Sequence, residues 1–141
     1  MLDSLEKELI LEAMKIRKNS YSPYSKYAVG AAILGIDGKI YTGANVENAS
    51  YGATICAERS AATNACSRGV RTFTKIAIVG GPNNEGDKHY EFSYPCGICR
   101  QFLNEFCSED MEVIVAKDLE EYRKVKFKDL LAFAFGPKNL E

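Results

Sequence analysis

The sequence predicts an α/β fold, a three-layer α-β-α sandwich in which helices cover both faces of a five-stranded mixed sheet. Three observations support this class: a helical apolar pattern opens the chain, a hairpin signal follows it, and two apolar strands then alternate with helices. The 141 residues contain no internal repeat and no long linker, and 46% of them are hydrophobic. We therefore expect one domain over residues 1–141, large enough to bury a core.

The first third of the chain predicts a helix and a hairpin. Asp3 and Glu6 have the spacing of a capping box, and apolar residues follow them at helical intervals. Asp37-Gly38 is a strong signal for a tight turn between two antiparallel strands. The corresponding elements are a helix over residues 3–18 and strands over residues 27–34 and 39–46.

The rest of the chain predicts alternating helices and strands. Gly69 supplies a stop for one helix, and Pro95 stands just ahead of the next. Helical crossovers imply parallel neighbouring strands, and the two apolar strands are of the kind that is buried on both faces. The expected elements are helices over residues 56–68, 96–106 and 126–135 and strands over residues 75–81, 111–117 and 122–125.

The charge balance argues against a nucleic acid polymer as partner. Lys and Arg together number 18 and Asp and Glu 19, which gives a net charge of -1 and a pI near 5.9. Binding along a phosphate backbone needs a concentrated positive stripe. The one basic cluster, residues 123–128, is flanked by Glu120, Glu121 and Asp129. We expect a solvated surface of mixed charge there.

Hydropathy and cysteine usage indicate the cellular compartment of the protein. No window approaches the roughly 18 apolar residues of a membrane span, and the acidic N-terminus is unlike a secretory signal. Five cysteines, an odd number, without an export signal indicate a reducing compartment, so we expect a cytoplasmic protein with thiol or metal chemistry. Cys66 and Cys107 match no ligand motif, and we expect them to be buried inside helices.

Three cysteines stand at the starts of two expected helices. Cys56 opens the run Cys-Ala-Glu-Arg, and Cys96 and Cys99 lie in Pro-Cys-Gly-Ile-Cys. A lone CxxC is also typical of a redox pair or of half a structural zinc site. A closed structural site needs a fourth ligand, for which His89, the sole histidine, is the candidate. Three ligands and an open position are what a catalytic zinc requires, so we favour one Zn²⁺ per chain in that role.

Glu58 and Arg59 follow the first of these cysteines. Glu58 lies two residues past a ligand, so it could take a proton from zinc-bound water and return it to a ring nitrogen and then to a leaving amine. These steps are hydrolytic deamination, the general pattern of zinc deaminases. Helix N-termini supply positive potential, and Arg59 could donate hydrogen bonds to a ligand sulfur; both would offset the charge of three thiolates. Arg59 is otherwise an ordinary surface residue.

Five sequence blocks together carry a family resemblance. They span nearly the whole chain and resemble the small homotetrameric cytidine deaminases. The blocks are residues 22–27 (SPYSKY), 45–52 (NVENASYG), 54–61 (TICAERSA), 95–101 (PCGICRQ) and 130–135 (LLAFAF).

The resemblance implies a cytidine-deaminase-like fold and a role for each matched residue. Cys56, Cys96 and Cys99 would bind zinc, Glu58 would shuttle protons, and the tetramer would share its active sites. The other implied roles concern the substrate: Asn45 and Glu47 would hydrogen-bond the ribose 3′-hydroxyl, the Ala57 backbone would meet the pyrimidine edge, Tyr27 would line the base pocket, Tyr51 would help to close it, and Phe135 would stack on the base from a neighbouring subunit.

Two positions depart from the family pattern. The family usually has Phe where Tyr27 stands, and a buried tyrosine hydroxyl needs a hydrogen-bond partner. It usually has Pro where Ala132 stands, before Phe135. Neither position touches the metal or the proton shuttle, so the departures bear on substrate preference and not on reaction class.

We therefore predict zinc-dependent deamination of cytidine and deoxycytidine to uridine and deoxyuridine plus ammonia, a reaction of pyrimidine salvage. Three alternatives stay open. The same chemistry could act on a cytosine-containing antibiotic, although related deaminases of that kind lack the NVENASYG segment. A polynucleotide editor would need a basic groove with aromatic stacking platforms. A non-enzymatic zinc module would use His89 as the fourth ligand.

Overall fold

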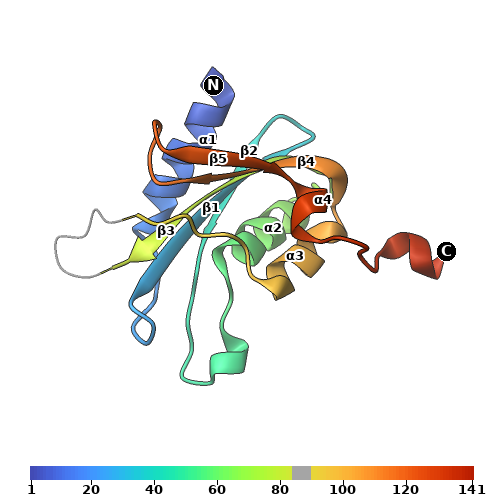
Figure 1. Cartoon of the computed structure of the whole chain (residues 1–141). Coiled ribbons are helices and arrows are strands. Elements are labelled where there is room, and N and C mark those ends of the chain that lie inside the picture. Colours follow the sequence, from blue (N-terminus) through green and yellow to red (C-terminus); the bar gives the residue numbers. More distant parts are fainter. Residues whose placement is uncertain (84–89) are drawn as a thin grey trace.

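The computed structural model describes residues 1–83 and 90–141, and it confirms the predicted sandwich (Figure 1). A five-stranded mixed sheet lies at the centre, with helices on both faces. The strands are β1 (Tyr27–Gly35), β2 (Ile40–Ala44), β3 (Phe73–Pro82), β4 (Cys107–Ala116) and β5 (Tyr122–Lys126). The helices are α1 (Ser4–Arg17), α2 (Ala57–Ser67), α3 (Gly97–Asn104) and α4 (Phe127–Leu130), with single 3₁₀ turns at Tyr51–Ala53 and Pro137–Leu140.

The strand order is β2-β1-β3-β4-β5. β1 is antiparallel to both β2 and β3, β3 is parallel to β4, and β5 is antiparallel to β4. The expected parallel neighbours are therefore found at β3 and β4, whereas β1 separates β2 from β3. Since β2, β3 and β4 all run the same way, the segments that leave β2 and β3 toward α2 and α3 start from the same edge of the sheet.

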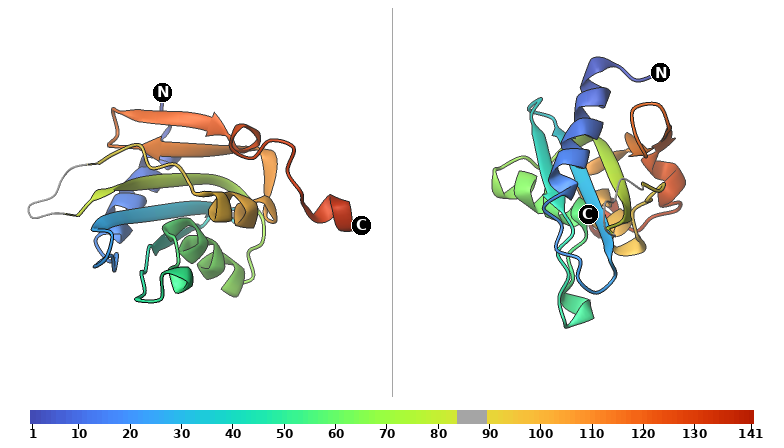
Figure 2. Two further views of the ribbon diagram at one scale, coloured as in Figure 1. Left: turned by 60° about the horizontal axis from the view of Figure 1, so that its bottom comes forward. Right: turned by 90° about the vertical axis from the view of Figure 1, so that its left-hand side faces the viewer.

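Alternate residues of each central strand serve two separate cores. In β3, Ile76 and Ile78 join the cluster packed with α2 and α3, while Ala77 and Val79 join the cluster beneath α1. This is the period-2 alternation of a strand that is covered on both faces. In the left view of Figure 2, α2 and α3 lie side by side in front of the sheet and α1 lies behind it.

Two glycines allow helices to approach the strand backbone closely. A Cβ at Gly30 would lie 2.1 Å from the Ala13 carbonyl oxygen of α1, and a Cβ at Gly43 would lie 2.3 Å from the Ala61 backbone nitrogen of α2. The buried face of α2 consists mostly of alanines, which allows the helix to pack closely on the sheet. The buried alanines of this face are Ala57, Ala61, Ala62 and Ala65.

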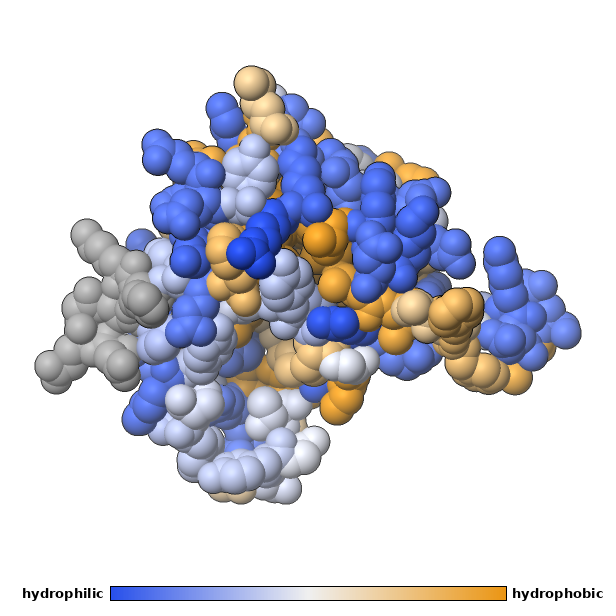
Figure 3. Space-filling model, in the orientation of Figure 1, coloured by the Kyte–Doolittle hydropathy of each residue, from blue (hydrophilic) through white to orange (hydrophobic). Residues whose placement is uncertain are grey.

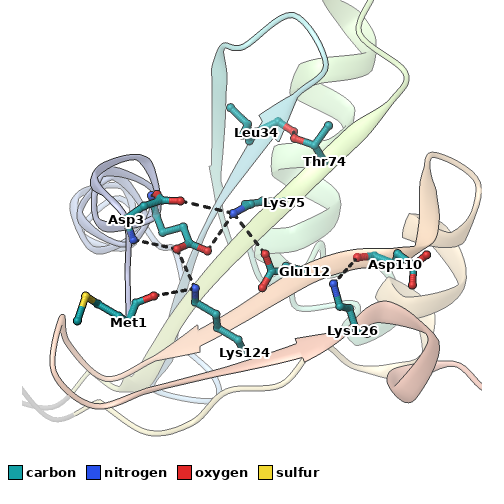
Figure 4. A network of polar contacts seen from close by, with 10 residues as sticks. Met1, Asp3, Leu34, Thr74, Lys75, Asp110, Glu112, Lys124 and Lys126 are labelled. Atoms are coloured by element: carbon teal, nitrogen blue, oxygen red, sulfur yellow. Dashed lines mark hydrogen bonds and ion pairs between the residues drawn. The ribbon is translucent and has the colours of Figure 1, made fainter.

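The predicted capping box is present and is part of a larger network (Figure 4). Asp3 Oδ1 accepts the Glu6 N–H at 2.8 Å, and Glu6 Oε1 accepts the Asp3 N–H at 3.0 Å. Glu6, which is buried, also accepts hydrogen bonds from Lys75 of β3 at 3.0 Å and from Lys124 of β5 at 2.8 Å. One carboxylate thus ties the start of α1 to two strands.

Two sequence predictions about local structure are wrong. The helix expected over residues 126–135 ends at Leu130, because the Leu130 carbonyl accepts a hydrogen bond from Arg100 Nη1 at 2.8 Å and Phe133 has a left-handed φ of 51°. Cys107 begins β4 instead of lying in a helix, and both Cys66 and Cys107 are half-buried rather than buried. Residues 131–141, here called the C-terminal arm, extend away from the sheet (Figure 1).

The Glu6 network predicts a loss of stability in acid. Burial alone would raise the pKa of Glu6, but hydrogen bonds from Lys124, the Asp3 N–H and Lys75 outweigh it and lower the pKa from 4.5 to about 2. A depressed carboxyl pKa stabilises the fold above the unfolded value and loses that contribution as pH falls through the folded one. We expect Glu6→Gln, which keeps the cap, to cost about 3 kcal/mol at pH 7 in urea unfolding.

The difference between wild type and Glu6→Gln should narrow as the pH falls from about 5 toward 2. Glu8→Gln, at an exposed position of the same helix, is the matched control and should change the unfolding free energy little. A Glu6→Gln deficit that stays constant with pH would show that packing, and not charge, stabilises this corner.

Candidate active site

Two helix starts bring three sulfurs together. Cys56 is the N-cap residue of α2, Cys96 is the N-cap residue of α3, and Cys99 lies in the first turn of α3. The three Sγ atoms lie within 4.8 Å of one another, and those of Cys56 and Cys96 are 3.7 Å apart. The helix starts meet because α2 and α3 follow strands that point to one edge of the sheet, so topology sets the site.

The sulfur geometry fits zinc. Tetrahedral zinc with Zn–S bonds of about 2.3 Å places its sulfurs about 3.8 Å apart, close to the observed Cys56–Cys96 separation. Cys99 is buried and Cys96 is exposed, so the group is closed on one side and open on the other. His89, the alternative fourth ligand, lies outside the described residues.

The thiol pKa values reflect crowded negative charge. A hydrogen bond with Cys99, together with contacts from Arg59 and Cys96, lowers the pKa of Cys56 to about 5 despite its partial burial. The pKa of Cys99 is raised by its hydrogen bond with Cys56, by burial and by the charge of Glu58. Three thiolates this close can all ionise only around a cation, which is the behaviour expected of a metal site.

Arg59 lies against the ligand group. Its Nη2 donates to Cys56 Sγ at 3.8 Å and to the Thr54 carbonyl at 3.1 Å. Its Nε is buried and finds no hydrogen-bond partner among the described residues. The guanidinium is therefore placed where sequence reasoning put it, with its charge close to a sulfur.

Glu58 lies in the first turn of α2 with only 4% of its surface exposed. Burial, and then the negative charge of Cys56, raise the pKa of Glu58 from 4.5 to about 7. A carboxyl group with a pKa near neutrality can both take up and release a proton at physiological pH, which is what a proton shuttle requires.

A cavity of about 500 Å³ opens beside the cysteines and Glu58. Four of the residues predicted to bind substrate line it: Tyr27, Asn45, Glu47 and Ala57. Asn45 lies directly after β2, at the carboxyl end of the strand, where ligands of open α/β sheets usually bind.

The other two residues predicted to bind substrate, Tyr51 and Phe135, do not line this cavity. Tyr51 is 74% exposed and lines an adjoining pocket of about 310 Å³, where its ring meets that of Tyr24 edge-on. Ser25, Glu47 and Thr54 border both pockets. Phe135 lies on the C-terminal arm, 59% exposed, with its carbonyl held by Gln101 and Asn104.

One wall of the cavity was missed by sequence reasoning. Phe92, Ser93 and Tyr94 line it, although the sequence marks this stretch only as a polar loop. The Phe92 ring is held by Arg123, whose guanidinium carbon lies 4.1 Å from the ring centroid, and by Lys117 at 4.9 Å. No motif identifies such a wall, because strand-end cations hold it from distant parts of the sequence.

The hydroxyl group of the partly buried Tyr27 has a hydrogen-bond partner. Its oxygen lies 2.5 Å from Ser93 Oγ and 3.5 Å from a carboxylate oxygen of Glu91. The additional hydroxyl, relative to the usual phenylalanine, thus joins the start of β1 to the segment that leads to Cys96. It is directed at this wall of the cavity and not at the cysteines.

Comparison with known proteins identifies the family. Residues 3–117 match the family described as the cytidine and deoxycytidylate deaminase zinc-binding region. The chain belongs to this family. It is therefore a zinc-dependent hydrolytic deaminase, and the group of Cys56, Cys96 and Cys99 fits one zinc ion per chain.

Similar proteins cover almost the whole chain. A cytidine deaminase of Sporosarcina psychrophila is 44% identical over 136 residues, which cover 94% of this chain and 93% of that protein. A probable cytidine deaminase of Dictyostelium discoideum is 41% identical, covering 98% and 88% respectively. A crystal structure of cytidine deaminase from Burkholderia pseudomallei has a TM-score of 0.80 at 39% identity and covers 95% of this chain and 100% of that chain. The predicted fold and family are confirmed.

No helix in residues 1–83 or 90–141 combines the length and apolarity that a membrane span needs.

Removing one thiol should remove the metal from this deaminase. We expect Cys96→Ser to lower zinc from one per chain to a substoichiometric level after dialysis, because a catalytic site has only three protein ligands. Atomic emission spectrometry measures the metal, and Cys66→Ser, a half-buried cysteine in α2, is the control that should keep one zinc. Full zinc in Cys96→Ser would contradict the ligand set, and zinc loss in His89→Ala would indicate a closed four-ligand site.

Proposed function

We propose that this deaminase converts free cytidine and deoxycytidine to uridine and deoxyuridine plus ammonia, as a pyrimidine salvage enzyme. The observation that carries the proposal is the arrangement of a single cavity. Glu58 and two of the cysteines, Cys56 and Cys96, line the same cavity as Asn45 and Glu47. A base directed at Glu58 and a sugar held by Asn45 and Glu47 make a nucleoside the natural occupant.

Asn45 and Glu47 offer opposite hydrogen-bonding groups. Asn45 Oδ1 accepts from the Val29 N–H at 2.9 Å and its Nδ2 donates to the Tyr27 carbonyl at 2.8 Å, so one Nδ2 hydrogen remains for a ligand. Glu47 Oε1 accepts from the Tyr24 and Ser25 N–H groups at 3.0 and 3.1 Å, and a carboxylate offers only further acceptance. A donor beside an acceptor matches a hydroxyl group.

This pair supports a nucleoside over a nucleotide phosphorylated at the bound hydroxyl. A phosphate has only acceptor oxygens and carries negative charge, so Glu47 would repel it. We assign the ribose 3′-hydroxyl to these two residues. The single negative net charge of the chain and its mixed-charge surface are consistent with a small substrate in place of a polymer.

The chemistry assigned to the chain centres on Glu58. Zinc, when bound by the three cysteines, would supply an acidified water. Glu58 accepts one proton of the attacking water and passes it to the pyrimidine ring nitrogen. It then carries the remaining proton of the added hydroxyl to the amino group, which leaves as ammonia. Burial raises the pKa of Glu58, which helps the carboxyl group to hold the proton between the two transfers. The Ala57 backbone borders the base, and Tyr27 lines the pocket beside it.

We also propose a homotetramer whose subunits share active sites. Phe133 and Phe135 of the C-terminal arm are 106% and 59% exposed, although aromatic side chains are usually buried. Figure 3 shows apolar side chains along the segment that joins the body of the protein to the C-terminal tip. Insertion into a neighbouring subunit would cover this surface, with Phe135 on the base and Tyr51 closing the pocket. Five free cysteines fit a cytoplasmic, reducing setting.

Glu58→Gln tests the reaction. We expect the variant to keep its zinc and its fold and to lose at least about 10³-fold in kcat on cytidine, because an amide cannot carry the proton. Loss of cytosine ultraviolet absorbance follows turnover. Glu105→Gln, at an exposed position after α3, is the isosteric control and should match wild type. Wild-type turnover by Glu58→Gln would refute the shuttle, and a zinc-loaded wild type that leaves cytidine intact would point to another cytosine compound.

Mixing two variants tests the shared site. We expect Phe135→Ala to lower kcat/KM on cytidine about 10-fold through lost stacking. When Phe135→Ala and Glu58→Gln chains are refolded together, hybrid oligomers should regain activity, since one chain supplies Glu58 and the other Phe135. Light scattering should give a mass about four times 15.6 kDa. A single-chain mass would refute the tetramer. Lys138→Ala, at an exposed polar position of the arm, is the control and should match wild type.

A further inference from the structure

A hydroxyl that does not line the cavity contacts the proposed sugar-binding amide. Ser20 Oγ lies 2.5 Å from Asn45 Oδ1. The orientation of the Asn45 amide is already fixed, because the Val29 N–H can only donate and the Tyr27 carbonyl can only accept. Asn45 Oδ1 is therefore an acceptor, and the single hydroxyl hydrogen of Ser20 must be donated to it.

The hydrogen-bond chain continues behind Ser20. Ser22 Oγ lies 3.2 Å from Ser20 Oγ, and Asn83 Nδ2 donates to Ser22 Oγ at 2.6 Å. The Ser20–Ser22 contact has Ser20 as its possible donor, but the single Ser20 hydrogen goes to Asn45 Oδ1, which is much closer at 2.5 Å. Ser22, which is 4% exposed and accepts from Asn83, lies beside Ser20 and helps to hold its hydroxyl next to Asn45.

Aligned hydrogen bonds polarise one another. Donation to Oδ1 draws electron density toward the carbonyl oxygen, so the amide Nδ2 becomes more positive and its remaining hydrogen becomes a stronger donor. The cavity is lined by Asn45 but not by Ser20, Ser22 or Asn83. Ser20 can therefore act on a bound substrate only through Asn45.

We propose that Ser20 is a positioning residue for recognition of the sugar 3′-hydroxyl, holding and polarising Asn45 as its donor. The inference rests on the proposed function, which assigns that hydroxyl to Asn45 and Glu47. Ser20 thereby becomes a determinant of the preference for substrates with a free 3′-hydroxyl, although it touches neither the substrate nor the metal.

The test compares two substrates that differ only in this hydroxyl. Zinc-loaded wild type and Ser20→Ala are assayed on cytidine and on 3′-deoxycytidine. We expect Ser20→Ala to lower kcat/KM for cytidine by about 3- to 10-fold, mainly through KM, and to change that for 3′-deoxycytidine by less than about 2-fold. Ser20→Thr keeps the hydroxyl and should restore the preference for cytidine. Ser67→Ala, at an exposed position of α2, is the control.

Each other outcome overturns a defined part of the argument. An equal fall on both substrates would show a general structural role for Ser20, and no fall on cytidine would show no role; either overturns the inference. If the wild-type enzyme converts both substrates equally well, the assignment of the sugar 3′-hydroxyl to Asn45 and Glu47 is wrong, and the inference about Ser20 is wrong with it. Deamination itself would still stand. Conversion of neither substrate refutes the proposed function itself. Should Ser20→Ala fail to fold, Ser20→Cys, similar in volume but a weak donor, replaces it.

Discussion

The meeting of the amino-terminal ends of α2 and α3 is the constraint on which the site depends. It requires β2 and β3 to run in the same direction, which they do because β1 is antiparallel to both. It also requires α2 to lie against the backbone of β2, which Gly43 and the buried alanines of α2 permit. A larger side chain at Gly43 would move Cys56 and Glu58 together, since Cys56 caps α2 and Glu58 lies in its first turn. Packing on the sheet therefore fixes the distance between sulfurs on different helices.

The N-termini of α2 and α3 also affect the electrostatics of the site. Two helix N-termini and Arg59 place positive potential around three sulfurs, which would otherwise resist joint ionisation. Opposing influences act on the pKa of Glu58: burial and the charge of Cys56 raise it, and Arg59 lowers it. A cation at the sulfurs would favour the ionised carboxylate. Glu58 is thereby suited to begin the reaction as a base, while its burial favours holding the proton afterwards.

Local signals in the sequence were enough for most of the elements and for the grouping of the three cysteines. The Asp3–Glu6 box, the Asp37-Gly38 turn and the CxxC motif are each read from neighbouring residues, and the structure confirms them. Features that depend on distant partners were not predictable in this way. The Arg100 contact that ends α4 spans 30 residues, and the cation contacts of Phe92 come from β5 and from Lys117. Donation from Ser20 to Asn45 likewise depends on how the segment after α1 lies against the end of β2.

Glu47 shows how a binding site can select by repulsion. Burial would raise the pKa of Glu47, but hydrogen bonds from the Ser25 side chain and from the Ser25 and Tyr24 backbone outweigh it, so the pKa is lowered and the group stays ionised near neutrality. These contacts also leave the carboxylate in a fixed position, so it cannot turn away from an unsuitable ligand. The hydrogen bonds of Asn45 fix the orientation of its amide, so the group that it offers to a ligand is an N–H donor. A hydroxyl satisfies both residues at once, whereas a phosphate would satisfy the amide and oppose the carboxylate. The proposed selectivity for a nucleoside thus rests on two polar groups whose positions are fixed by their other hydrogen bonds.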